Sequence, residues 1–243
     1  MNTTYKGHIN SYTLKIIAII CMTFDHVGNV FHDQIPLWGR MILFAPGGLT
    51  FPIMAFLLTE GYTHTRDVKK YGQRLLIFAI VAFVPFAWGV FHALNILFTL
   101  FFGLIVIYLY DHMTKRVGFW FIFIGITLLS MFCDWGIMGV PMILCYHTIK
   151  NPVRRVVVPL FFIWIFTIID VVMSVVTMPD IDLLAMIPNI LYAFVGSTAT
   201  IPLLLNYNGA RGRSMKYFFY TYYPAHLLVL AILRGLIFGI WWQ

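Results

Sequence analysis

The chain has 243 residues, of which 61% are hydrophobic, 18% are aromatic and only 10% are charged. This composition excludes a water-soluble globular protein, because a soluble fold of this length cannot bury so much apolar surface. Sixteen Lys and Arg residues against nine Asp and Glu give a formal net charge of +7. Their placement, described below, accounts for the charge without a nucleic-acid partner.

Long apolar runs recur from end to end, and the gaps between them are too short to hold a separate soluble domain. We therefore predict an all-α, polytopic transmembrane bundle that forms a single integral membrane domain over residues 1–243. The first run is as long as a full span and lacks a small-residue cleavage site, so we expect it to be retained. At about 17–25 residues per span, nine helices are predicted near residues 13–32, 37–62, 72–91, 94–110, 117–133, 136–149, 153–177, 183–206 and 214–241.

The second predicted helix carries a break. Pro46-Gly47-Gly48 interrupts it, and Pro52 follows within the same span. A break frees backbone groups that protein or water must satisfy, so we expect this segment to line a cavity. In the eighth helix Pro188, Gly196 and Pro202 predict a similar interruption.

The distribution of basic residues predicts the orientation. Every second connection is basic, and these connections hold fourteen of the sixteen Lys and Arg residues: Lys6, Lys15, Arg66, Lys69, Lys70, Arg74, Lys115, Arg116, Lys150, Arg154, Arg155, Arg211, Arg213 and Lys216. The positive-inside rule then places the amino terminus and the basic loops in the cytoplasm. With nine spans in a cell membrane, the carboxyl terminus is extracytoplasmic.

Asp25 and His26 lie about twelve residues into the first apolar helix. An ionisable side chain at membrane depth costs about 2.5–3.5 kcal/mol, so such residues face the protein interior or water and are functional by default. Neighbouring residues on a helix point about 100° apart, so each needs a partner on another helix. The alternative is a structural polar pair that locks helix packing. Arg40, at the outer start of the second helix, is expected to pair with Asp25 or Asp33.

Two further intramembrane groups are candidates for chemistry. His226 lies about as deep in the last helix as His26 does in the first, so the two imidazoles could share one cavity. Histidine takes and returns protons near neutral pH. Glu60 lies nearer the inner face, whereas His112 and His147, near the inner ends of their helices, are interpreted as interfacial residues without a chemical role.

Two cytoplasmic stretches, residues 60–74 and 207–217, mix Arg and Lys with Gly and Tyr. Arg presents a planar donor fork to phosphate, Gly allows close backbone approach, and an aromatic face can stack on a nucleobase. The combination favours a nucleotide-like, phosphate-rich ligand. The alternative, anchoring to anionic lipid, is favoured for Lys69, Lys70, Arg154 and Arg155. The three cysteines, Cys21, Cys133 and Cys145, have no metal-ligand spacing, and no metal is expected.

The order of these motifs resembles the TraX family, which is named for an integral membrane acetylase of conjugative pilin. The resemblance rests on Leu14-Lys15-Ile-Ile-Ala18, Asp25-His26-Val-Gly28, Gly39-Arg40, Phe51 to Arg66, Tyr71 to Arg74, Leu94-Asn95, Asp134-Trp135, Tyr207-Asn-Gly-Ala-Arg211 and Tyr223-Pro-Ala-His226.

The resemblance implies an acyltransferase that uses acetyl-CoA. The acceptor would be an amine, such as a peptide or pilin amino terminus, or a hydroxyl of an extracytoplasmic glycan. His26 would act as general base, Asp25 or Glu60 would fix a protonation state, and His226 would lie beside the acetyl group. Arg40 would stabilise developing negative charge. CoA would be held by His64, Arg66, Tyr71, Arg74, Tyr207, Asn208, Arg211, Lys216 and Tyr217.

Two other functions fit the same residues. In a proton-coupled small-molecule transporter, Asp25, His26, Glu60 and His226 would form a relay. A transporter, however, needs no phosphate-binding loops on one face. In a non-catalytic membrane scaffold, the intramembrane charges would merely pair with one another.

Overall fold

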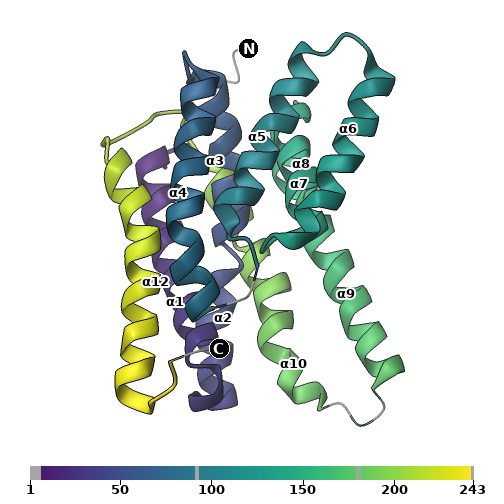
Figure 1. The fold of residues 1–243 in the computed structure, drawn as a ribbon. Coiled ribbons are helices and arrows are strands. Elements are labelled where there is room, and N and C mark those ends of the chain that lie inside the picture. Colours follow the sequence, from purple (N-terminus) through teal and green to yellow (C-terminus); the bar gives the residue numbers. More distant parts are fainter. Residues whose placement is uncertain (1–6, 91–92, 179, 181, 242–243) are drawn as a thin grey trace. The chain divides into compact units, whose positions relative to one another are not determined.

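A computed structural model describes residues 7–90, 93–178, 180 and 182–241, and in this part of the chain every regular element is a helix (Figure 1). The elements are α1 (Ser11–Val30), η1 (His32–Gln34), α2 (Leu37–Gly47), α3 (Thr50–His64), α4 (Val68–Gly89), α5 (Ile96–His112), α6 (Arg116–Leu129), η2 (Ser130–Phe132), α7 (Gly136–Thr148), α8 (Pro152–Val157), α9 (Leu160–Thr177), α10 (Leu183–Ile190), the π-helix η3 (Leu191–Gly196), α11 (Thr200–Leu205) and α12 (Lys216–Phe238).

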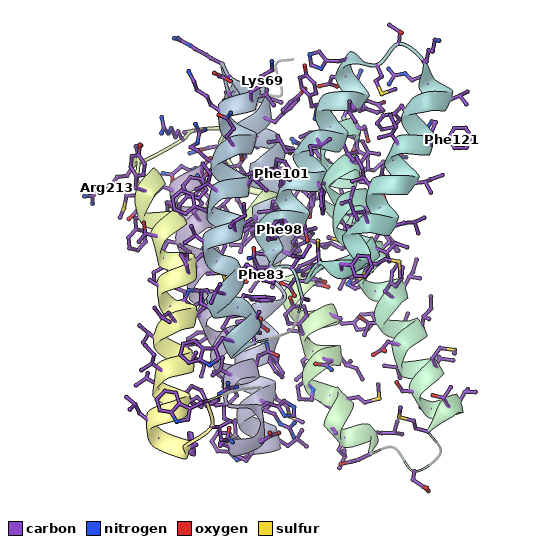
Figure 2. All side chains as sticks on the ribbon, in the orientation of Figure 1. Lys69, Phe83, Phe98, Phe101, Phe121 and Arg213 are labelled. Carbon is purple, nitrogen blue, oxygen red and sulfur yellow. The ribbon has the colours of Figure 1, made fainter. Side chains whose placement is uncertain are left out.

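The predicted all-helical transmembrane fold is confirmed, and each of the nine predicted segments corresponds to helix. Three of these segments, Ile96–His112, Arg116–Phe132 and Gly136–Thr148, are apolar but shorter than a typical span. Large apolar side chains such as Phe83 and Phe121 lie on the outside (Figure 2), as expected where lipid replaces water. Among the described residues, six segments are long and apolar enough to cross a membrane: Ser11–Val30, Leu37–His64, Val68–Gly89, Pro152–Thr177, Leu183–Leu205 and Tyr217–Phe238.

Local sequence sets where several of these helices begin. Asn10, Asp67, Asn95, Asn151 and Asp182 each precede a helix and accept a hydrogen bond from a main-chain N–H in its first turn, at 2.9–3.1 Å. A side-chain oxygen at this position satisfies one of the donors that the first helical turn leaves unpaired. The starts of α1, α4, α5, α8 and α10 are therefore encoded by single polar residues.

The helices group into two compact units, each assembled from segments far apart in sequence. Unit 1 comprises Met1–Met54 and Asn151–Ser214, and unit 2 comprises Ala55–Lys150 and Met215–Gln243. α3 begins in unit 1 and ends in unit 2. The expectation of one domain over residues 1–243 stays a prediction.

In unit 1 the predicted break in the second span is present, and it packs against the π-helix η3. α2 ends at Gly47 and α3 starts at Thr50. A Cβ on Gly48 would lie 2.0 Å from the main-chain oxygen of Tyr192, and a Cβ on Gly196 would lie 2.0 Å from that of Ala45. The two backbones therefore touch at a place where neither residue can carry a side chain.

In unit 2 the α4–α5 and α6–η2–α7 connections are tied together. Leu94 N–H donates to the Phe132 oxygen at 2.9 Å, and Asp134 N–H donates to the Leu94 oxygen at 2.7 Å. The fully buried Asn95 amide donates to the Ala79 oxygen of α4 at 2.8 Å. These bonds satisfy backbone groups that an apolar surrounding would otherwise leave without partners.

Substituting Gly196 with Ala is expected to lower the melting temperature of the purified protein, because the new methyl group meets backbone atoms at 2.0–3.0 Å. Overpacking of this kind costs about 1–3 kcal/mol. Gly125 of α6 is the matched control, since a Cβ there meets nothing within 4 Å. Thermal unfolding in detergent that shows equal melting temperatures for Gly196→Ala and Gly125→Ala would contradict the close approach.

Candidate functional site

α1 carries the Asp25-His26 pair in its second half, as predicted. His26 is buried with 5% of its surface exposed, whereas Asp25 is half-buried. The side chain of Asn29 donates to the main-chain oxygen of Asp25 at 2.9 Å, one turn further along the helix. Both ionisable groups therefore belong to a helix segment that is packed into unit 1.

The Asp25 carboxyl group lies at the break between α2 and α3. The point where a Cβ of Gly47 would lie is 2.9 Å from Asp25 Oδ1 and 2.9 Å from Cε2 of Tyr192. A carboxyl oxygen and the edge of a phenol ring therefore meet over a glycine, and any larger residue at position 47 would displace one of them. Tyr192 belongs to η3 and was not among the predicted site residues. The only sequence signal for it is its place between Pro188 and Gly196.

Arg40 pairs differently from the prediction. Its Nη1 donates to Nε2 of His32 at 2.6 Å, and Nδ1 of His32 lies 3.1 Å from the Asp33 carboxylate. This arrangement fits a neutral imidazole that donates through Nδ1 and accepts through Nε2. The expected direct pairing of Arg40 with Asp25 or Asp33 is therefore wrong. The Asp25 carboxyl group lies beside Gly47 at the end of α2. Arg40 is about two turns earlier in the same helix, or about 10 Å away along its axis.

Glu60 and His226 belong to unit 2, and both are buried. His226 Nδ1 donates to the Tyr222 oxygen at 2.9 Å, and its ring stacks on the Tyr222 ring at a centroid distance of 4.9 Å. Because Nδ1 donates a hydrogen bond to a carbonyl oxygen, the neutral ring carries its proton on Nδ1, and Nε2 is the basic nitrogen. The main-chain oxygen of Glu60 accepts a hydrogen bond from Nδ1 of His64 at 2.8 Å.

The first basic stretch combines exposed and packed residues. Arg66 and His64 are exposed. Lys70 donates its main-chain N–H to the Asp67 carboxylate, which lowers the pKa of Asp67, and its ammonium lies 3.3 Å from the same group. The charge of Lys70 is therefore partly balanced within the stretch.

Tyr71 and Arg74, from the same stretch, point into unit 2. The guanidinium group of Arg74 lies 5.7 Å from the centroid of the Tyr71 ring and close to the Tyr220 hydroxyl. Tyr220 in turn stacks on Phe78 at 4.6 Å. The buried Nε of Arg74 has no hydrogen-bond partner in the described part of the chain.

The second basic stretch begins in unit 1, where the segment that precedes α1 holds it. Ile9 makes two main-chain hydrogen bonds with this loop. Its N–H donates to the Asn206 oxygen, and its oxygen accepts from the Asn208 N–H, both at 2.9 Å. Tyr207 is 2% exposed and its hydroxyl lies 2.8 Å from that of Ser11. The Tyr207 ring is therefore a packing group, and a nucleobase could stack on it only if the loop opened.

The remaining predicted ligand residues lie at the surface. Arg211 is exposed and donates to the Ser214 hydroxyl at 2.9 Å. Tyr217, in the first turn of α12, is 72% exposed. Lys216 begins α12, but its side chain lies outside the described residues.

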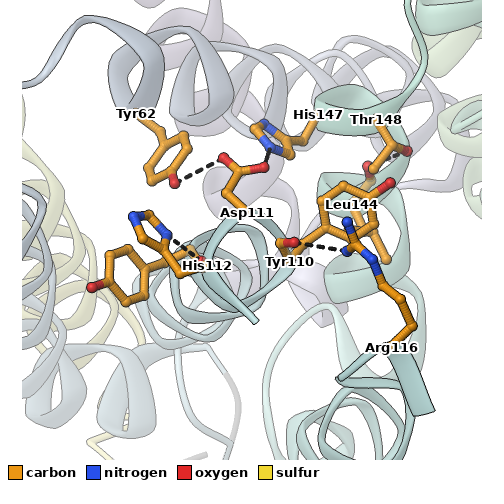
Figure 3. Close-up of polar contacts among 9 residues, drawn as sticks. Tyr62, Tyr110, Asp111, His112, Arg116, Leu144, His147 and Thr148 are labelled. Atoms are coloured by element: carbon orange, nitrogen blue, oxygen red, sulfur yellow. Dashed lines mark hydrogen bonds and ion pairs between the residues drawn. The ribbon is translucent and has the colours of Figure 1, made fainter. Parts of the chain in front are cut away.

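A third polar cluster, in unit 2, was missed by the sequence analysis (Figure 3). Asp111 accepts hydrogen bonds from the Tyr62 hydroxyl and from Nε2 of His147, both at 2.9 Å. The three residues come from the carboxyl-terminal ends of α5, α3 and α7, which are far apart in sequence. The sequence predicts an interfacial position for His147, yet its side chain is only 12% exposed. With its proton on Nε2, the neutral ring presents Nδ1 as an acceptor.

Neighbouring His and Arg side chains donate hydrogen bonds to main-chain oxygens near the end of α5. His112 donates to the Tyr108 oxygen and Arg116 donates to the Tyr110 oxygen, both at 2.8 Å (Figure 3). The Arg116 guanidinium also lies 4.7 Å from the centroid of the Tyr110 ring. The Tyr110 oxygen is one of the carbonyl groups that the end of α5 leaves without an intrahelical partner, and Arg116 satisfies it.

Metal and thiol chemistry find no support in the described residues. Among them, no group of three or more His, Cys, Asp or Glu side chains is arranged to hold a metal ion. Cys21 and Cys133 are buried and Cys145 is half-buried, and all three are free thiols. Burial raises the pKa of Cys133 to about 11, so its thiol stays protonated at neutral pH.

Replacing Asp111 with Ala is expected to destabilise the protein by about 1–3 kcal/mol, because it leaves the Tyr62 hydroxyl and His147 Nε2 without their acceptor. Asp180→Ala, in an exposed turn, is the control and should stay within about 0.5 kcal/mol of the unsubstituted protein. Thermal unfolding in detergent measures both. Equal stability of the two variants would mean that the cluster does not hold the three helix ends together.

The chain is similar over most of its length to known proteins. Residues 10–234 match the family described as TraX protein. Over 241 residues the chain is 27% identical to "Probable fimbrial assembly protein FimC, serogroup H1" of Dichelobacter nodosus, an alignment that covers 91% of this chain and 94% of that relative. No solved structure shows a significant match. Because the family match runs from the cap of α1 to Arg234 near the end of α12, and so includes every predicted site residue, this chain belongs to the TraX family.

Proposed function

We propose that the protein is a membrane-embedded acetyltransferase that moves an acetyl group from cytoplasmic acetyl-CoA to an amine or hydroxyl of an extracytoplasmic substrate. The observation that carries this proposal is the meeting of the Asp25 carboxyl and the Tyr192 ring edge over Gly47, beside a break in a membrane helix. Irregular backbone at membrane depth is tolerated where it lines a cavity or is buried in protein. Acid–base groups at such a place are functional candidates.

The chemistry requires one proton acceptor and one source of electrostatic stabilisation. In the proposed reaction His26 takes the proton from the acceptor amine or hydroxyl as that group attacks the thioester carbonyl. The C–S bond then breaks, and the departing thiolate takes the proton from His26, which returns the imidazole to its neutral form. Asp25 holds the protonation state of the site, and its position over Gly47 makes it sensitive to any side chain added there.

In unit 2, His226 has the tautomer of a proton acceptor at Nε2 and Glu60 is a buried carboxyl. We propose that both are further acid–base groups of the reaction. Arg40, which donates to His32, is proposed to stabilise the negative charge that develops in the reaction.

The donor is proposed to bind through the basic stretches. Arg66, His64, Arg211 and Tyr217 are exposed and available to phosphate and adenine groups. Arg74 and Tyr71 are packed in unit 2, where the buried guanidinium offers an Nε donor without a described partner. Asn208 and Tyr207 shape the second loop from within. Lys216, whose side chain lies outside the described residues, is proposed as a further ligand. The residues thus supply the donors that a phosphate-rich ligand needs.

The acceptor is proposed to be a subunit of a surface fibre or another exported peptide or glycan. The relative from Dichelobacter nodosus is named a probable fimbrial assembly protein. A multi-pass protein with donor-binding loops inside could modify such a subunit as it passes through or leaves the membrane. Transfer of this kind removes a positive charge from an amine without changing the subunit backbone.

Isothermal titration of the purified protein with acetyl-CoA is expected to show saturable binding that Arg66→Ala and Arg211→Ala weaken about tenfold each, the loss of one charged hydrogen bond. Lys69→Ala is the matched control, because Lys69 is exposed on the same stretch and is interpreted as a lipid anchor. His26→Ala should abolish acetyl transfer and leave acetyl-CoA binding nearly unchanged.

The orientation is tested with the same assay. Acetyl-CoA should support transfer in inside-out vesicles and fail to do so in right-side-out vesicles. Absence of acetyl-CoA binding, together with proton-coupled uptake of a small molecule, would replace the acetyltransferase by the transporter alternative. Retained turnover in His26→Ala would move the general base to another residue.

Gly47→Ala is expected to lower the rate of acetyl transfer at least tenfold, because the added methyl group would lie 2.8–2.9 Å from Asp25 Cβ, Asp25 Oδ1 and the Tyr192 ring. Acetyl-CoA binding, measured by titration, should change little. The control is Gly72→Ala, where a Cβ meets its nearest neighbours at the ordinary distance of 3.6 Å. A full rate in Gly47→Ala would show that the Asp25 position does not matter for the reaction.

A further inference from the structure

Most side chains in the second half of α9 are exposed. At the start of the helix, Leu160 and Ile163 are buried and Trp164 donates to the Ser197 hydroxyl at 2.9 Å. Beyond this end most side chains are apolar and exposed; those with about half or more of their surface exposed are Ile165, Ile168, Ile169, Val172, Met173 and Val176. The buried side chains of α9 therefore lie at its start.

Asp170 lies in the middle of this exposed segment. It is the eleventh of the eighteen residues of α9, so it lies about 10 Å along the axis from the last residue, Thr177. Its side chain is exposed, and the described part of the chain offers it no hydrogen bond and no ion pair. Because the span Pro152–Thr177 has 26 residues and is about 39 Å long, Asp170 falls inside a hydrocarbon layer of about 30 Å.

A carboxylate in this position needs a partner. Aspartate is too short to reach the headgroup region from about 10 Å inside the helix end, as lysine or arginine can. An unpaired charge on a lipid-facing helix is disfavoured, and charged residues in spans pair with one another or face water. Polar side chains also hold transmembrane helices together where the hydrophobic effect does not. The exposed carboxyl group therefore indicates a helix–helix contact completed by another chain.

We propose that α9 docks a transmembrane helix of a partner protein that carries a Lys or Arg side chain at the depth of Asp170. The charge of Asp170 selects this occupant. A second copy of the chain that packed α9 against α9 about a twofold axis would bring two carboxylates together, which like-charge repulsion disfavours. Lipid acyl chains can cover the apolar face, but they offer the carboxylate no hydrogen bond and no counter-charge. This proposal is independent of acetyl transfer.

The test uses the full-length protein in lipid nanodiscs and synthetic Leu/Ala transmembrane peptides. The peptides carry Lys, Leu or Glu seven residues from the end that matches the Thr177 end of α9. Binding is measured by energy transfer between a dye on the peptide and one at the carboxyl terminus of the protein. The Lys peptide is expected to bind about tenfold more tightly than the Leu peptide.

Variants then assign the preference to the carboxylate. Asp170→Asn should remove the preference for Lys, and Asp170→Lys should transfer it to the Glu peptide. Val176→Asn, which places an amide at another exposed position of α9, should keep the preference for Lys. Thermal unfolding of all variants checks that unit 1 remains folded.

Three results would overturn the proposal. Equal binding of the Lys and Leu peptides would contradict a partner helix with a basic side chain. An unchanged preference for Lys in Asp170→Asn would show that another residue makes the contact. Energy transfer between two differently labelled copies of the protein, competed by the Lys peptide, would assign the α9 face to a second copy.

Discussion

The close approach of two backbones at Gly48 and Gly196 is the contact on which unit 1 depends. A membrane helix cannot be interrupted without satisfying the carbonyl and N–H groups that the break releases, because lipid supplies no hydrogen bonds. Here the interrupted second span meets a π-helix of the eighth span, and backbone atoms of the two lie too close to admit a side chain. The irregular segments of the two helices therefore pack directly against each other.

This contact also positions the polar groups of α1. Because Gly47 carries no side chain, the Asp25 carboxyl and the Tyr192 ring edge occupy the volume where its Cβ would lie. Asp25 thus lies in the part of unit 1 where the backbone departs from regular helix. A carboxyl group beside a packed, rigid break is held more exactly than one on a free helix surface, which is the property that a catalytic or ion-handling group requires.

Polar groups in unit 2 are satisfied in a different way. At the ends of α3, α5 and α7, Asp111 accepts from Tyr62 and His147, and nearby basic side chains donate to main-chain carbonyl groups. Charge at these ends is paired locally. Asp170 of α9 is the contrast within the described chain, since its carboxylate lies on an exposed apolar helix and has no such partner.

Composition and hydrophobic run length alone determined that the chain is an all-helical membrane protein, and Pro46-Gly47-Gly48 determined where the second span breaks. Asn and Asp caps determined several helix starts, since capping is a contact within four residues. The order of motifs along the chain indicated the TraX family. These features depend on residues close in sequence or on composition, which a linear chain displays directly.

Only the tertiary structure decided which polar groups meet. It joined Asp25 to Tyr192, more than 160 residues apart in the sequence, paired Arg40 with His32, buried Tyr207 against Ser11, and gathered Tyr62, Asp111 and His147 from three helices. Periodicity shows which face of a helix is apolar, but it carries no information on which distant helix packs against that face. The partner of a buried polar side chain is therefore fixed by packing, because the free energy of that contact depends on groups that the local sequence does not contain.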